Sequence, residues 1–304
     1  FVEARIEALS VRGQALQIEG LSGDLPGQFS IDRLMIADAD GTWTTVDDIT
    51  ASWRTLTLLW GRLHLNDVQI AKVDTTRRPV LAPAEARTSN GSSLLEHYTL
   101  KRGRVSEIAL AAGIAGPQQA YQLDLSLNTQ AVAGDVQLAL APLNGNGDQV
   151  DVDLEWGSDV PVRGQAQITG AVNGLIAQIL QIPHGEGFRA QIDAVGTATA
   201  WDLTAKSDIG GQSWLTLTSQ IDSAKLSVDG EASLDKLGAA RALAGRLGTQ
   251  AKWSFEYTPG DGALSGTLDA SSLSARVSGV RVADAADMVL APFSVDIRGL
   301  NASR

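Results

Sequence analysis

Few residues in this chain have the type and spacing that chemistry requires. His64, His97 and His184 are the only histidines among 304 residues, and they lie far apart in the sequence. A metal site or a catalytic dyad would need folding to gather them, so ordinary structural or surface roles are the favoured interpretation. No nucleophile elbow, phosphate-binding loop or dinucleotide fingerprint occurs. The sequence therefore predicts a protein that is not an enzyme, with no catalytic residue and no cofactor.

An acidic segment superficially suggests a calcium loop. Asp38, Asp40 and the pair Asp47 and Asp48 surround the glycine at position 41. The loop lacks a third acidic ligand before this glycine and a glutamate at its end, both of which an EF-hand requires. The segment therefore predicts a turn with solvated acids and no metal site. The absence of cysteine also excludes disulfides and thiolate zinc sites.

The charge of the chain argues against a nucleic-acid partner. The formal net charge is -11 and the sequence pI is about 4.7. The basic clusters at residues 77–78 and 101–104 are too short to form a phosphate-binding stripe. No apolar run reaches the ~18 residues that a membrane-spanning helix needs. Because the chain begins with Phe1 instead of Met, we expect a processed or excised piece of a longer protein.

The elements that would position any site are mostly strands. Apolar residues alternate with polar ones in short runs, such as Tyr121, Leu123, Leu125 and Leu127, and Asn-Gly or Asp-Gly turns separate the runs. This pattern is typical of an antiparallel meander with one apolar and one solvated face. Apolar residues make up 44% of the chain but aromatics only 5%, so the apolar face is aliphatic.

Three segments depart from the strand pattern. Residues 56–60 predict one helical turn, and residues 171–181 and 233–247 have apolar residues at helical spacing. Helices this short need a surface to pack on, so we expect them to cap the sheet. The segment 80–97 lacks periodicity and predicts a loop or linker. The expected organisation is a first β-section at 1–79, this linker, and a continued β-section at 98–304.

The order of predicted strands, glycines and tryptophans along the chain resembles that of the TamB family of the AsmA-like superfamily. The first section has IEGLSGDLPGQFSIDRLMIADADGTW, continues through ASWRTLTLLWGRLHLNDVQIAKV and ends at RRP. In it, Gly20, Gly23, Leu34, Asp38, Gly41 and Trp43 lie at family-like places. A second segment is similar to the family's short helix ending at a proline: GAVNGLIAQILQIPHGEGFRAQIDAVGTATAWDLTAKSDIGGQ.

The resemblance implies an elongated, twisted antiparallel sheet curled into an open hydrophobic groove, with a few short helices. It implies a protein anchored in the inner membrane of a Gram-negative bacterium and crossing the periplasm. Its role would be to carry phospholipid between the inner and outer membranes. The outer-membrane barrel protein TamA would be a partner, through a C-terminal region that is absent from this chain, as is the N-terminal membrane anchor.

The alternation itself agrees with a lipid-carrying groove. An aliphatic trough can shelter acyl chains from water, at about 0.8 kcal/mol for each buried methylene. The expected partner is therefore the acyl chain of a phospholipid. The residues predicted to line the groove are Leu123, Leu125, Leu138, Leu140, Val152, Leu154, Ile168, Ile192, Leu217 and Phe255. Their facing depends on strand parity, which a single bulge reverses.

Other functions produce the same alternation and stay open. A chaperone-like scaffold of the translocation and assembly module could bind unfolded strands by β-augmentation and so assist outer-membrane protein insertion. A structural solenoid or stalk could pack the apolar face against itself. A transmembrane barrel is disfavoured, because aromatic girdles are missing and helices interrupt the strands.

Overall fold

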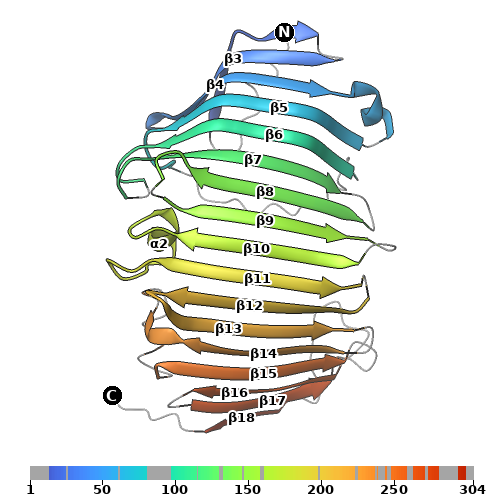
Figure 1. Ribbon diagram of the computed structural model, residues 1–304, viewed down its shortest axis with the longest axis vertical. Helices are drawn as coiled ribbons and strands as arrows, with labels where there is room; N and C mark the ends of the chain where they lie inside the picture. The colour runs from blue at the N-terminus through green and yellow to red at the C-terminus, as the bar shows by residue number, and fades with distance from the viewer. Residues whose placement is uncertain are drawn as a thin grey trace. The chain divides into compact units, whose positions relative to one another are not determined.

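The chain forms β-sheet with only a few short helices in the computed structural model (Figure 1). Strands follow one another along the sequence, and most pair with the preceding strand in antiparallel orientation. The prediction of a mainly β fold with few short helices is therefore confirmed. The structure describes residues 14–24, 27–60, 62–80, 97–114, 116–129, 133–145, 147–157, 161–197, 199–222, 225–236, 238, 244, 248–258, 263–270, 273–280 and 294–298.

Two compact units divide the chain, unit 1 at residues 1–153 and unit 2 at residues 154–304. Unit 1 contains β1 (Ala15–Glu19), β2 (Ser22–Asp24), β3 (Gln28–Asp38), β4 (Gly41–Trp53), β5 (Arg62–Thr75), β6 (His97–Leu110), β7 (Gln119–Thr129) and β8 (Gly134–Pro142). Strands β1 and β2 both pair with β3, and β3 to β8 then follow in sequence order. Strand β9 (Gln149–Trp156) contains the boundary between the units.

One pairing in unit 1 departs from the antiparallel order that the sequence predicted. Strands β5 and β6 are parallel, with Arg62 opposite His97 and Thr75 opposite Leu110. A parallel pair needs a crossover connection instead of a hairpin, which explains the non-periodic segment predicted at 80–97. Residues 81–96 of that segment lie outside the described residues. The segment falls inside unit 1, because β5 and β6 pair across it.

Unit 2 is a regular antiparallel meander. Its strands are β10 (Val162–Gly170), β11 (Phe188–Gly196), β12 (Trp201–Ile209), β13 (Gln212–Ile221), β14 (Leu226–Ser233), β15 (Gln250–Thr258), β16 (Ala263–Ala270), β17 (Leu273–Val280) and β18 (Ser294–Arg298). Each strand from β11 to β18 pairs with the one before it. Pairing of strands that are neighbours in sequence is the commonest arrangement in such sheets.

The structure tests two of the three predicted helical segments in full. The 3-10 turn η1 (Thr55–Trp60) follows β4 and confirms the predicted helical turn. Helix α2 (Leu175–Ile179) occupies only the centre of the segment predicted at 171–181, between left-handed Asn173 and Gln181. The 3-10 turn η2 (Leu234–Lys236) begins the segment predicted at 233–247, most of which lies outside the described residues. No helix in the described parts of the chain is long and apolar enough to cross a membrane.

Bulges in unit 1 keep one face of the sheet apolar. In β6, Leu100 and Gly103 lie opposite Leu127 and Leu125 of β7, so three steps along β6 match two along β7. A second extra residue separates Val105 from Ile108 in the same way. An inserted residue reverses strand parity, so apolar residues three apart point to the same side. Strand β5 follows β6 residue by residue and carries the same irregularity.

The acids of the first hairpin are not all solvated, which corrects the sequence-based prediction. Gly41 takes φ 101° in the turn after β3, a value that glycine adopts freely. The Asp38 side chain is only 1% exposed and forms an ion pair with Arg77. The backbone N–H groups of Asp40 and Val80 also donate to the Asp38 carboxylate, at 2.9 and 2.6 Å. This clamp joins the hairpin to the chain segment that leaves β5.

Candidate functional site

The largest uniform feature of unit 1 is a continuous apolar face. Residues directly opposite one another on paired strands share a face, so the register defines rows of side chains. One row consists of Ile31, Ile49, Ile70, Val105, Leu123 and Leu140. The next row consists of Phe29, Ala51, Val68, Gly103, Leu125 and Leu138. Four of the predicted groove residues therefore form two facing pairs, Leu123 with Leu140 and Leu125 with Leu138.

Unit 2 has an apolar face of its own. One row contains Ala166, Ile192, Ala205, Leu217, Gly230, Trp253 and Leu268. Phe255 lies two residues from Trp253 in β15, and Ile168 lies two residues from Ala166 in β10. Four further predicted groove residues, Ile168, Ile192, Leu217 and Phe255, consequently share this face.

The last two predicted residues lie in β9. Val152 and Leu154 are half-buried and alternate with exposed Asp151, Asp153 and Glu155. A Cβ atom added to Gly164 would come within 2.9 Å of Leu154 Cδ1, so Leu154 lies on the apolar face of unit 2. The lining role of the ten residues stays a prediction.

The apolar faces are only partly covered. All ten predicted residues are half-buried, and none of them is fully buried. The one cluster of buried residues in the described chain is small: Ala177, Ile182, Phe188 and Ile209. Helix α2 and the segment after it supply the first two, and they cover one end of the unit 2 face beside β10 (Figure 1). An ordinary core would bury far more of these side chains.

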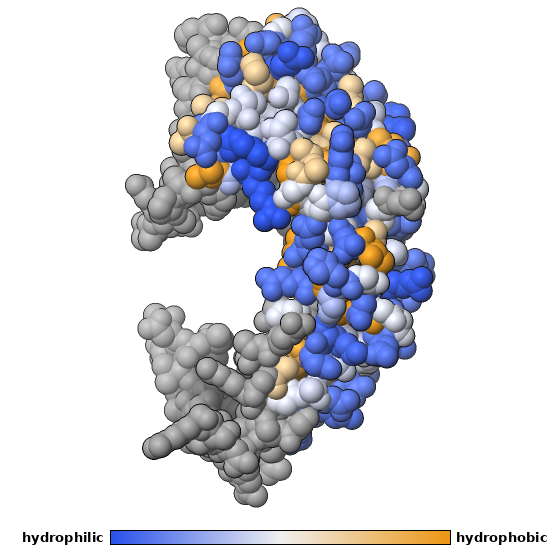
Figure 2. Space-filling view, turned by 90° about the vertical axis from the view of Figure 1, so that its left-hand side faces the viewer, coloured by the Kyte–Doolittle hydropathy of each residue, from blue (hydrophilic) through white to orange (hydrophobic). Residues whose placement is uncertain are grey.

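The opposite face of unit 1 carries charged residues whose signs alternate from strand to strand. One row alternates in sign through Glu19, Arg33, Asp47, Lys72 and Glu107. Ion pairs join Arg33 to Asp47 at 2.8 Å and Lys72 to Glu107 at 3.3 Å. Figure 2 shows that hydrophilic residues cover most of the described surface on the side it presents, with hydrophobic residues in small groups between them. Each sheet is therefore amphipathic, with one wet and one apolar face.

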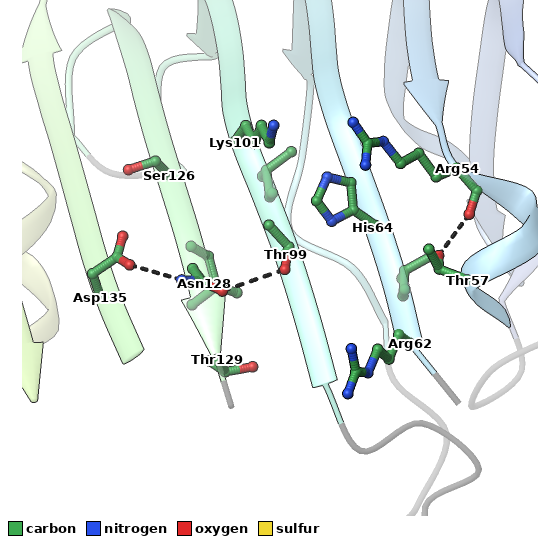
Figure 3. Close-up of a pocket in the computed structure, with 13 residues that line it drawn as sticks. Arg54, Thr57, Arg62, His64, Thr99, Lys101, Ser126, Asn128, Thr129 and Asp135 are labelled. Carbon is green, nitrogen blue, oxygen red and sulfur yellow. Dashed lines mark hydrogen bonds between the residues drawn. The ribbon is translucent and has the colours of Figure 1, made fainter. Parts of the chain in front are cut away.

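A pocket of about 670 Å³ lies where η1 meets β5 to β8, and polar residues line it together with Leu63, Leu100 and Leu127. His64, Thr99, Asn128 and Asp135 form one row across it. Asn128 donates to Asp135 at 3.1 Å and accepts from Thr99 at 3.4 Å. Figure 3 shows the side chains of Arg54, Arg62 and Lys101 around His64.

The electrostatics of this pocket are set by its basic residues. The backbone N–H of Arg54 donates to the His64 carbonyl at 2.9 Å, which places the two side chains next to each other. Burial lowers the pKa of His64 below its ordinary value, and the charges of Arg54 and Lys101 lower it further. His64 Nε2 is buried and has no hydrogen-bond partner among the described residues. The lowered pKa favours an uncharged imidazole beside the cations Arg54, Arg62 and Lys101.

His64 lies in unit 1 and His184 in unit 2. His184 Nδ1 lies 3.2 Å from Asn173 Oδ1 in unit 2, and the side chain of His97 lies outside the described residues. No group of metal-ligating side chains occurs within the described ranges. Sequence reasoning missed the grouping of Arg54, Arg62 and Lys101. The signals for this grouping were the alternation of polar and apolar residues at 62–64 and the basic cluster at residues 101–104. The parallel β5–β6 pairing that brings these segments together was not predictable from the sequence.

No protein-family model, curated protein or solved structure matches this chain.

Proposed function

We propose that this protein is a lipid-transport groove that shelters phospholipid acyl chains on the apolar faces of its sheets. The observation that carries the proposal is the pair of apolar faces on which all ten predicted lining residues stay half-buried, although Ile31 and Ala51 in the unit 1 rows are buried. Large exposed apolar surfaces on a folded protein mark sites where an apolar ligand or partner binds.

The chemistry of these rows suits acyl chains. Leucine, isoleucine, valine and alanine follow one another across strand after strand, with no charged residue in the rows. Each methylene that leaves water for such a surface gains about 0.8 kcal/mol. Successive similar rows would let a chain move along the sheet without one deep binding site. The charged opposite face keeps the sheet in contact with water.

The cellular setting in this proposal comes from the resemblance to the TamB family. It includes anchoring to the inner membrane, passage through the periplasm, transport of phospholipid between the membranes, and TamA as the outer-membrane partner. The face chemistry supports the lipid part of this proposal, because acyl chains need an aliphatic, water-excluding surface.

Site-specific photocrosslinking tests the proposal directly. A photoreactive residue at Leu138 or Leu154 should capture phospholipid in cells and in purified protein. The matched controls are Gln137 and Glu155, exposed neighbours on the opposite face. Equal capture at Leu138 and Gln137 would reject an acyl-chain site on the apolar face.

The same experiment separates the lipid groove from the strand-binding scaffold. Crosslinks at Leu138 to unfolded outer-membrane protein segments, with no lipid adduct by mass spectrometry, would favour the scaffold. Crosslinks to lipid alone would favour transport.

A further inference from the structure

We propose that the pocket formed by Arg54, Arg62, His64 and Lys101 binds a phosphate group. Leu63, Leu100 and Leu127 line it together with the polar residues, but none of the ten residues predicted to line the acyl-chain groove does. Its ligand class is a phosphate monoester or diester, either free in solution or part of a lipid headgroup.

The first argument is the pairing of basic residues in unit 1. Ion pairs occupy Arg33, Lys72, Arg77, Arg102 and Arg104. Arg78 donates to the Ile114 carbonyl. The remaining described basic residues of this unit are Arg54, Arg62 and Lys101, which have no ion pair with any described residue and line the same pocket. In a chain of net charge -11, such a concentration of unpaired cations favours an anion.

The second argument is the set of donors that the pocket offers. Two guanidinium groups present forks that match the oxygens of phosphate, and a lysine adds a point charge. Ser126 contributes a hydroxyl group to the same lining, whereas Thr57 and Thr99 donate theirs to the Arg54 carbonyl and to Asn128. A phosphate has more acceptor oxygens than a carboxylate, so it uses more of these donors.

The third argument is the buried Nε2 atom of His64. A buried polar nitrogen without a partner is costly, and an anion in the pocket would give it one. The charged groups around His64 are Arg54 from the end of β4, Arg62 on its own strand, Lys101 from β6 and Asp135 from β8. Strand β7 contributes only uncharged Ser126, Leu127, Asn128 and Thr129. A bound anion would stabilise the imidazolium, so binding should strengthen as the pH falls.

Nuclear magnetic resonance of the histidine rings tests the site in the full chain. Titration with inorganic phosphate should shift the His64 imidazole signals saturably and leave those of His184 unchanged. Sulfate, which stays a dianion throughout, should bind more tightly at lower pH. The His64 signals are assigned by their loss in His64→Gln.

The variants Arg54→Gln and Lys101→Gln should each weaken phosphate affinity roughly tenfold. Arg163→Gln, an exposed residue of β10 in unit 2, removes the same charge and should leave the affinity unchanged. Circular dichroism checks that each variant folds. An affinity that is the same in Arg54→Gln and in the wild type overturns the proposal. So does an equal shift with chloride at matched ionic strength.

Vesicle sedimentation distinguishes the two sources of the phosphate. Binding to phosphatidylglycerol vesicles that is lost in Arg54→Gln but kept in Arg163→Gln identifies a headgroup. Binding of inorganic phosphate without such vesicle binding identifies a soluble phosphate compound. Failure of both probes rejects the site, whereas the crosslinking at Leu138 is unaffected by this result.

Discussion

The Asp38 carboxylate forms an ion pair and several hydrogen bonds within unit 1. It accepts hydrogen bonds from the Arg77 guanidinium and from two backbone N–H groups while almost fully buried. The hydrogen bonds from Arg77 hold the pKa of Asp38 well below its ordinary value of 3.8. The folded protein therefore stabilises the negative charge of Asp38 beside the chain segment that follows β5.

Replacing this carboxylate should destabilise the protein. In Asp38→Asn, the Arg77 guanidinium loses its anionic partner and the N–H of Val80 loses a charged acceptor. Because the pKa is lowered in the folded state, the stabilisation exists above the unfolded pKa and disappears as the pH falls below about 4. Asp38→Asn should therefore lower Tm at neutral pH, and the difference from the wild type should shrink in acid. Differential scanning calorimetry between neutral and acid pH measures both effects.

The control for this prediction lies two residues away. Asp40 is exposed in the same turn, so Asp40→Asn should change Tm little. A Tm of Asp38→Asn equal to that of Asp40→Asn at neutral pH would show that the clamp contributes nothing.

At the scale of strands, the apolar face of unit 2 depends on glycine facing an aromatic ring. Gly230 in β14 lies opposite Trp253 in β15, and the indole occupies the space that a Cβ atom at Gly230 would need. Gly266 in β16 has the same relation to Phe255. Large and small side chains thus alternate between strands, and the rings lie flat along the sheet instead of standing away from it.

A side chain at Gly230 should displace the indole. We expect Gly230→Val to reduce the free energy of unfolding by about 1–3 kcal/mol, the usual cost of overpacking. The same substitution in a Trp253→Ala background should cost much less, because the space is then empty. Urea denaturation of the four proteins in this cycle gives the coupling. Asp229→Thr, on the exposed face of β14, is the matched control.

Strand alternation explains why so much of the fold could be predicted. The period-two pattern correctly grouped Leu123 with Leu125 and Leu138 with Leu140, because β7 and β8 contain no bulge. The same rule fails in β6, where Val105 and Ile108 share a face across an inserted residue. Bulges and the parallel β5–β6 pair depend on contacts between distant segments, which a local pattern does not encode. The pocket around His64 depends on the parallel β5–β6 pair, so the local pattern did not predict it.

At the scale of the whole molecule, the feature that most favours an apolar ligand is the small number of fully buried apolar residues relative to half-buried ones. Each unit is built of amphipathic sheet, and the fully buried residues in the described chain are few for its size. A soluble domain of this length normally buries its aliphatic residues against a second layer. Among the described residues, helix α2 and the segment after it cover the end of one face. The protein should therefore behave as one that needs an apolar ligand.

Removing that ligand gives the last prediction. Protein purified gently should carry phospholipid detectable by native mass spectrometry, and stripping it should increase binding of a hydrophobic dye and promote self-association. Because each unit has its own apolar face, Leu125→Lys with Leu138→Lys should reduce the bound lipid without abolishing it, and so should Ile192→Lys with Leu217→Lys. Only the combined variant should be free of lipid. Arg104→Gln with Gln137→Lys alters the opposite face and should change nothing. If the stripped protein stays monomeric and binds no dye, its own side chains cover the apolar faces. The proposal that these faces bind acyl chains would then be wrong.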